Sequence, residues 1–214
     1  MALATSASAN TLYSQAWDGV GNLDASQNDT TGGFGNFATT YDDFTLSQAA
    51  NVNGIEFVGG YFNPPAQSPI SAFTLTFYAD AGGAPGAAIA TGFFSGTAGE
   101  TSLGSPGGFP MFDYTINFVN FNMVAGTYWE SVVPDIGFPP QWGTGTSASG
   151  NGNAYQCFFG SCGVLGGGVN QAFSILGDAA GVPEPASWAL MLLGFGGIGS
   201  LLRARRRKQA VAAV

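Results

Sequence analysis

AFTLTFYAD, residues 72–80, is the stretch that decides the fold, because its apolar and polar side chains alternate with a period of two. Phenylalanine and leucine occupy positions 73, 75 and 77, while threonine and tyrosine occupy positions 74, 76 and 78. Successive side chains of a β-strand point to opposite faces, so this pattern predicts a strand with one face turned toward a core. The glycines and proline of DAGGAPG (80–86) then predict a turn.

Similar runs recur along residues 10–179. YTINFV (114–119) and FSI (173–175) alternate regularly. Less regular runs also predict strands: YDDFTL (41–46), VNGIEFVGGYF (52–62), AAIATGFF (87–94) and GTYWESVV (126–133). No segment before residue 182 repeats every 3.6 residues. We therefore predict an all-β domain of eight to ten short strands that forms a single antiparallel, jelly-roll-like β-sandwich, with a barrel as the alternative.

Residues 182–208, VPEPASWALMLLGFGGIGSLLRARRRK, have a different composition. No charge occurs from residue 186 to residue 202, a length that gives a helix of about 25 Å, close to the hydrocarbon core of a bilayer. Basic residues, which stay on the cytoplasmic side of a membrane, follow at once. We predict a C-terminal transmembrane helix at 186–202 with the domain outside and a basic stop sequence inside, formed by Arg203, Arg205, Arg206, Arg207 and Lys208.

This tail resembles the PEP-CTERM sorting signal in its PEPxxWA form. The resemblance rests on the apolar stretch, the basic cluster and a motif formed by Pro183, Glu184, Pro185, Trp188 and Ala189. It implies a Gram-negative bacterial protein that is exported, spans the inner membrane once, is processed by an exosortase and then reaches the cell surface or the medium. The tail is also similar to the ice-binding protein C-terminal domain, a label that implies no ice binding here. A plain membrane anchor is the alternative.

The first nine residues are predicted to be the remnant of a signal peptide whose start is truncated. They end in Ala7, Ser8 and Ala9, the small-residue pattern of a signal-peptidase site, but lack the basic and apolar regions that precede such a site. Cleavage before Asn10 is the corresponding hypothesis. The alternative is a short disordered arm.

Charge excludes several classes of function. The chain has no histidine, and all five of its basic residues lie in the tail, so the domain is purely acidic. It therefore has no side chain that would hold a phosphate backbone, and we expect no nucleic-acid partner. Imidazole-based catalysis is excluded as well, and we do not expect an enzyme. A carboxylate pair of the glycosidase kind is the catalytic plan that survives, drawn from Glu56, Glu100, Glu130, Asp113 and Asp135.

The two cysteines, Cys157 and Cys162, lie in QCFFGSCG. One pair without a second pair or a histidine does not suit zinc, so we predict a disulfide that forms in the oxidising exterior. We predict no obligatory cofactor. Calcium is the ion that the residues suggest, because oxygen ligands gather at Asp18, Asp24 and Asp29, although their spacing is not that of an EF-hand.

The order of the strand runs is also similar to a β-sandwich domain that recurs in front of PEP-CTERM tails. That resemblance spans nearly the whole domain and implies no activity. We expect a structural or matrix component of the cell envelope, associated with exopolysaccharide or biofilm. The alternative is a glycan-binding module in which exposed rings stack on sugars, with Trp142, Tyr155 and Tyr61 as candidates. A carboxylate glycosidase is a distant alternative.

Overall fold

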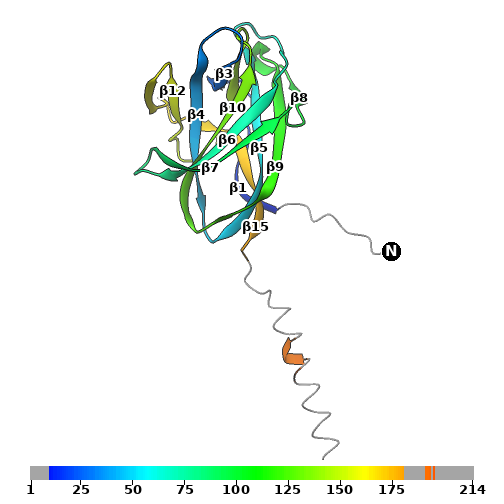
Figure 1. The fold of residues 1–214 in the computed structure, drawn as a ribbon, viewed down its shortest axis with the longest axis vertical. Helices are drawn as coiled ribbons and strands as arrows, with labels where there is room; N and C mark the ends of the chain where they lie inside the picture. Colours follow the sequence, from blue (N-terminus) through cyan, green and yellow to red (C-terminus); the bar gives the residue numbers. More distant parts are fainter. Residues whose placement is uncertain (1–9, 181–190, 194, 196–214) are drawn as a thin grey trace, which may run out of the picture. The chain divides into compact units, whose positions relative to one another are not determined.

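The computed structural model describes residues 10–180, 191–193 and 195. The predicted signal-peptide remnant at residues 1–9 lies outside the described residues, as does most of the sorting tail. The chain divides into two units, residues 1–180 and residues 181–214. The first unit is an all-β domain of two sheets, which confirms the predicted fold class (Figure 1).

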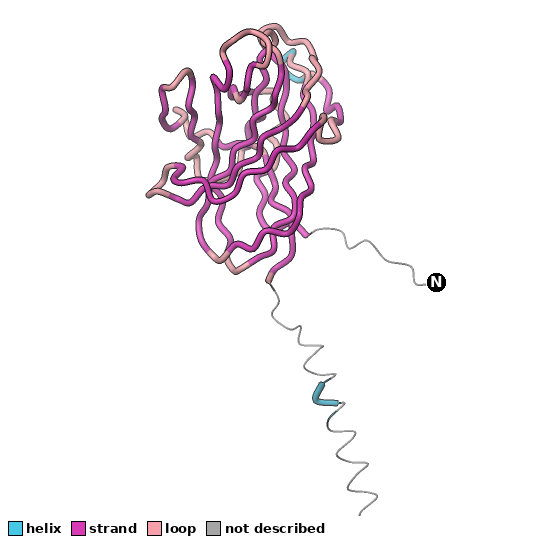
Figure 2. The backbone as a smooth tube through the Cα atoms, in the orientation of Figure 1, coloured by secondary structure: helices cyan, strands magenta, loops and turns pink. Residues whose placement is uncertain are grey.

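Strand residues make up most of the backbone of this domain (Figure 2). The eight-stranded sheet contains β1 (Asn10–Gln15), β2 (Leu23–Ala25), β5 (Ala50–Phe62), β8 (Thr101–Gly104), β9 (Met111–Met123), β11 (Gln141–Ser147), β14 (Asn170–Gln171) and β15 (Phe173–Ala179). The seven-stranded sheet contains β3 (Gln27–Asp29), β4 (Gly35–Leu46), β6 (Ala72–Asp80), β7 (Pro85–Ser95), β10 (Gly126–Ile136), β12 (Tyr155–Phe158) and β13 (Ser161–Val164). One short 3-10 helix, η1 (Pro106–Gly108), joins β8 to β9.

The first sheet runs in the order β1-β15-β5-β11-β14, with β9 on β5, β8 on β9 and β2 on β11. The second runs β13-β12-β4-β3-β10-β6-β7, with a further pairing between β4 and β10. All pairings are antiparallel except that of β3 with β10. Strands that are far apart in the sequence therefore become neighbours, and the two halves of the chain interleave within each sheet.

The prediction of eight to ten short strands is wrong in number, because residues 10–180 form fifteen. Several of the additional strands have only two to four residues and lie in glycine-rich segments that the sequence pattern assigns to loops. Two others, β5 and β9, reach 13 residues each. In β5 the chain continues through glycines that a propensity argument counts as breakers.

AFTLTFYAD forms β6 with the predicted polarity of its faces. Phe73, Leu75 and Phe77 are buried in the core, whereas Thr74 and Tyr78 are only half-buried on the opposite face. β6 pairs with β10 on one side and with β7 on the other. It therefore lies inside the seven-stranded sheet and fixes which face of that sheet meets the core.

Aromatic rings fill the space between the sheets. Phe57 stacks on Tyr114 with ring centroids 5.1 Å apart, and Phe73 from the other sheet meets both edge-on. Trp142 contacts all three rings. A Cβ atom on Gly59 would lie 2.1 Å from the Trp142 ring, so only glycine leaves room for the indole. The glycine inside β5 is therefore a packing feature and not a strand end.

Among the described residues no helix has the length and apolar character needed to span a bilayer. Residues 191–193 and 195 are helical. The rest of the predicted span at 186–202 and the whole basic cluster at 203–208 lie outside the described residues, so the transmembrane helix stays a prediction.

The packing of Trp142 predicts a large loss of stability on truncation. Trp142→Ala should lower the free energy of unfolding by about 3–5 kcal/mol, because the cavity left beneath Gly59 cannot collapse fully. Denaturant unfolding of the purified protein measures this change. Val119→Ala is the matched control, since Val119 is 91% exposed and should change stability by less than about 0.5 kcal/mol. A loss below about 1 kcal/mol for Trp142→Ala would contradict the assigned packing.

Candidate functional site

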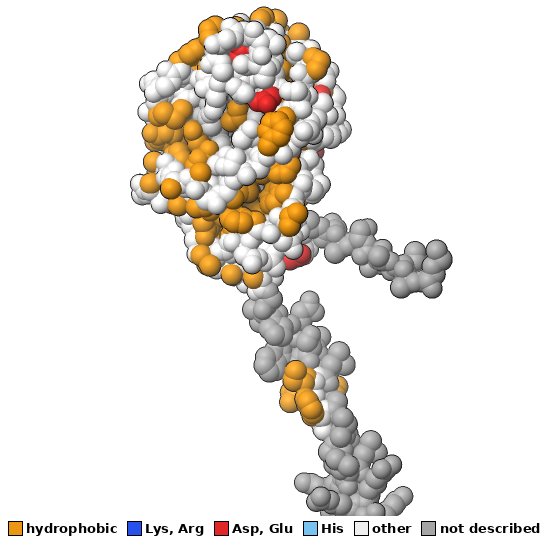
Figure 3. Space-filling model, in the orientation of Figure 1, with side chains coloured by type: hydrophobic (Ala, Val, Ile, Leu, Met, Phe, Trp, Pro, Cys, Tyr) orange, Lys and Arg blue, Asp and Glu red, His pale blue; other side chains and the backbone are white. Residues whose placement is uncertain are grey.

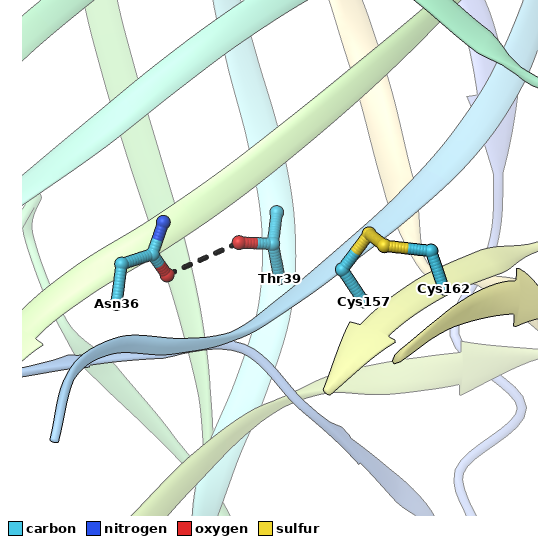
Figure 4. Close-up of a disulfide and its surroundings, with 4 residues drawn as sticks. All are labelled: Asn36, Thr39, Cys157 and Cys162. Carbon is cyan, nitrogen blue, oxygen red and sulfur yellow. Dashed lines mark hydrogen bonds between the residues drawn. A yellow bond between two sulfur atoms is a disulfide. The ribbon is translucent and has the colours of Figure 1, made fainter. Parts of the chain in front are cut away.

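The two cysteines lie opposite each other in the hairpin formed by β12 and β13. Cys157 pairs with Cys162 in register, and their sulfur atoms are bonded at 2.02 Å, which confirms the predicted disulfide (Figure 4). β12 also pairs with β4, where Cys157 lies opposite Thr39. The cross-linked hairpin therefore extends the seven-stranded sheet and holds Tyr155, the first residue of β12, beside Tyr41.

The outer face of the seven-stranded sheet is polar. One row of cross-strand partners crosses five strands, from Tyr155 through Tyr41, Ser131 and Thr76 to Thr91. A hollow of about 200 Å³ lies on this face. It is lined by Asn28, Asn36, Thr39, Tyr41, Thr74, Thr76, Tyr78, Ser131 and Val133. We call these nine residues together with Tyr155 the polar face.

Three tyrosines form the aromatic part of the polar face, and all three are half-buried. The ring of Tyr41 meets Tyr78 edge-on at 5.3 Å and Tyr155 edge-on at 6.3 Å. The Tyr78 hydroxyl lies 3.0 Å from the Ser131 hydroxyl. Trp129 is buried next to Tyr155 and donates from its indole nitrogen to Asp80 at 2.8 Å. Strand pairing and ring contacts thus fix the position of each tyrosine.

The predicted stacking platform is wrong in two of its three members. Trp142 lies in strand β11, and neither Trp142 nor Tyr61 has the exposed surface that stacking on a sugar requires. Their polar atoms are used internally, because the Trp142 indole donates to the Tyr114 hydroxyl and the Tyr61 hydroxyl donates to Glu100. Tyr155 belongs to the polar face, but the sequence reasoning missed its partners Tyr41 and Tyr78. The sequence does contain an indication for Tyr78, because Tyr78 lies on the polar side of the alternating pattern in AFTLTFYAD.

The five candidate carboxylates do not form a single catalytic centre. Glu130 is buried inside the sandwich, and Glu100 accepts hydrogen bonds from Tyr61, Tyr114 and Gln67. Asp135 accepts a hydrogen bond from Asn28 at 2.7 Å.

Two of these carboxylates do share a hollow. Glu56 and Asp113 line a depression of about 220 Å³ on the eight-stranded sheet, together with Trp17. Glu56 pairs with Thr115 while Asp113 pairs with Val58, so the two acids are diagonal neighbours on adjacent strands, about 7–8 Å apart at the backbone. Of the five candidate carboxylates, these two are the ones that line one hollow, so they are the pair on which a glycosidase plan can be tested.

The three calcium candidates are separated into different hydrogen-bond networks. Asp29 accepts from the backbone N–H groups of four residues, and its carboxylate closes the turn that follows β3. Asp24 accepts from the Gln171 amide, and Asp18 accepts from the Thr146 hydroxyl. Within residues 10–180 no three acidic, cysteine or histidine side chains form a group that would hold a metal. The structure therefore does not assemble the predicted ligand set.

Comparison with known proteins identifies the tail. Residues 181–208 match the family model of the PEP-CTERM protein-sorting motif, so the resemblance noted in the sequence is confirmed. No match to the chain is found among curated protein sequences. The individual motif residues Pro183, Glu184, Pro185, Trp188 and Ala189 lie outside the described residues.

Among solved structures, the domain is similar to the cysteine protease and lectin-like domains of Cwp84, a surface layer associated protein of Clostridium difficile. The TM-score is 0.42 at 10% sequence identity, and the match covers 67% of this chain and 32% of that chain. A likeness at this level has no bearing on function.

A pair of acidic side chains is buried between the sheets. Asp42 and Glu130 are cross-strand partners on β4 and β10, and they are 0% and 4% exposed. Asp42 accepts from the backbone N–H groups of Asp43 and Gln171, whereas one Glu130 oxygen has no partner among the described residues. Burial raises the pKa of Asp42 to about 7. Burial and the neighbouring Asp42 raise the pKa of Glu130 well above its usual value. Both carboxyls therefore prefer to keep their protons.

This pair predicts that the domain loses stability as the pH rises. A carboxyl whose pKa is higher in the folded state than in the unfolded state stabilises the fold fully below its ordinary pKa of about 4, and this contribution of Asp42 disappears as the pH rises through about 7. The free energy of unfolding should therefore fall between pH 5 and pH 8, by at most about 1.4 kcal/mol per pH unit for each proton. Asp42→Asn and Glu130→Gln should flatten this slope, and the exposed control Glu56→Gln should not. Stability that is constant or rising over this range would contradict the assignment.

Proposed function

We propose that this PEP-CTERM protein is a structural or matrix component of the bacterial envelope that associates with exopolysaccharide. The observation that carries the proposal is the match of residues 181–208 to the sorting motif. That signal implies export, passage through the membrane and recognition by an exosortase. The surface or biofilm matrix is then the place where the processed domain acts.

Several properties of the domain support a role outside the cell. Its described residues carry acidic side chains and no lysine, arginine or histidine. The Cys157–Cys162 disulfide is compatible with an oxidising exterior. An acidic surface without basic side chains repels the phosphates of nucleic acid. We therefore propose no nucleic-acid partner and place the domain outside the cell.

A glycan-binding module is the second candidate, and it is favoured by the polar face. Hydroxyl and amide side chains surround a shallow hollow there, and three partly accessible tyrosines adjoin it. Such a mixture of polar groups and aromatic rings suits sugar rings. A glycan-binding domain and a matrix component are compatible, because binding to polysaccharide is one way of being retained in a matrix.

We propose no enzymatic activity and no required metal. The carboxylate pair Glu56 and Asp113 provides a direct test of the first point. The protein should release no more reducing sugar from polysaccharides than the double variant Glu56→Gln, Asp113→Asn does. Activity that disappears in the double variant would instead assign a glycosidase to this pair.

The sorting tail predicts a specific processing event. The surface form from normal cells should have a lower intact mass than the full chain, with the end QAVAAV removed, and cells without exosortase should retain that end. Replacing the three PEP residues, Pro183, Glu184 and Pro185, by alanine should leave membrane insertion intact and abolish processing. Neutralising the basic cluster should invert or release some chains. A mature protein that still ends in QAVAAV in both strains would leave a plain anchor.

A further inference from the structure

We propose that the polar face binds an uncharged polysaccharide, with one sugar unit in the hollow and its neighbours along the sheet. This inference rests on the proposed extracellular function, because it names the class of ligand that the domain would meet there. It assigns binding to the seven-stranded sheet and not to the aromatic residues buried between the sheets.

The hollow offers hydrogen-bonding groups of the kind that sugar hydroxyls require. Two of these groups, the Asn36 amide nitrogen and the Thr74 hydroxyl, have no protein partner within residues 10–180, and neither has the hydroxyl of Tyr155 elsewhere on the polar face. Asn36 is exposed and Thr74 is half-buried, so both are accessible to a ligand. Donors and acceptors that are already placed on strands lose little conformational freedom when a ligand binds.

The tyrosines supply apolar contact surface beside these groups. Tyr41 lies between Tyr78 and Tyr155, and edge-on contacts hold each ring in place. The Cys157–Cys162 disulfide cross-links the hairpin that carries Tyr155, which makes that ring part of a rigid sheet and not of a free loop. Rigid aromatic rings are an efficient source of contact area because they have few rotatable bonds.

Charge selects the class of polysaccharide. Acids next to the polar face include Asp135, bonded to Asn28, and Asp43 and Asp80, which lie beside Trp129, while no basic side chain occurs anywhere in residues 10–180. Among the residues that the space-filling view in Figure 3 colours, acidic side chains are visible and basic ones are not. A uronic acid or a sulfated sugar would therefore meet repulsion without any compensating cation. An uncharged chain avoids this cost.

The size of the hollow agrees with a single sugar unit. Its volume of about 200 Å³ is below the roughly 300–1,000 Å³ of sites that enclose a drug-sized ligand. The row of cross-strand partners extends beyond the hollow to Tyr155 and Thr91, so a longer chain can meet further residues of the sheet. We therefore expect affinity to rise with chain length, as further units touch the sheet.

Titration calorimetry on the full chain in detergent tests the proposal. The uncharged probes are dextran, xylan and mixed-linkage β-glucan, and the acidic probe is alginate. At least one uncharged probe should bind, and alginate should not. Tyr155→Ala and Tyr41→Ala should weaken binding about tenfold, the effect expected from losing one ring contact. Thr74→Trp, which fills the hollow, should abolish binding.

Matched variants distinguish loss of the site from loss of the fold. Tyr41→Phe keeps the ring and should retain most of the affinity, and Tyr128→Phe and Val119→Ala lie off the polar face and should bind normally. Thermal unfolding identifies any variant that does not fold. The binding of the folded variants then decides whether the polar face is the binding site. Absence of binding to all three uncharged probes, binding of alginate in preference, or unchanged binding in Thr74→Trp would each overturn the proposal. None of these results would affect export and processing, which are read from the mass of the surface form.

Discussion

No lysine, arginine or histidine occurs in residues 10–180, so every hydrogen-bond donor that the domain offers to its own carboxylates is uncharged. Backbone N–H groups serve Asp29, and the Trp129 indole serves Asp80 together with two backbone groups of the following turn. Tyr61 and Tyr114 both donate to Glu100. Hydrogen bonds to a charged acceptor are worth more than neutral ones, about 1.5–3 kcal/mol each. Hydrogen bonds from uncharged donors to these acids therefore stabilise turns and strand ends, a role that ion pairs can take in proteins with lysine and arginine.

Where such donors are insufficient, the fold depends on protons. Asp42 has two backbone donors and Glu130 has an oxygen without a partner, and the two side chains face each other across neighbouring strands. Two buried charges at this spacing would repel strongly, so the stable arrangement has at least one carboxyl protonated. Because the domain has no cation to pair with these buried acids, its stability depends on pH.

The sequence predicts the fold well where a strand has a polar and an apolar face, and poorly where packing overrides the pattern. AFTLTFYAD is predicted correctly because both of its faces obey the rule. YDDFTL does not obey it, since Asp42 faces the interior with Phe44. Two backbone N–H donors and a pKa raised by burial explain how this carboxyl is tolerated there, and the local sequence reports neither. Trp142 is followed by glycines, which suggest a loop, but it lies in a strand, and a distant glycine on β5, Gly59, leaves room for its indole in the core. Tyr41 and Tyr155 meet only through strand pairing between distant segments, which local sequence patterns do not report.

The distribution of charge also connects the domain with its tail. Orientation in a membrane is set chiefly by lysine and arginine near the span, whereas acidic residues contribute little. Because all five basic residues of the chain lie between residues 203 and 208, no basic side chain of the domain competes with that cluster for the cytoplasmic side. The domain can be rich in acids without weakening this signal. The absence of basic side chains from the domain is therefore compatible with both of the roles proposed here. It leaves the orientation of the exported chain to the basic cluster, and it leaves the polar face without a cation that could hold an acidic polysaccharide, so that an uncharged polysaccharide is the ligand it suits.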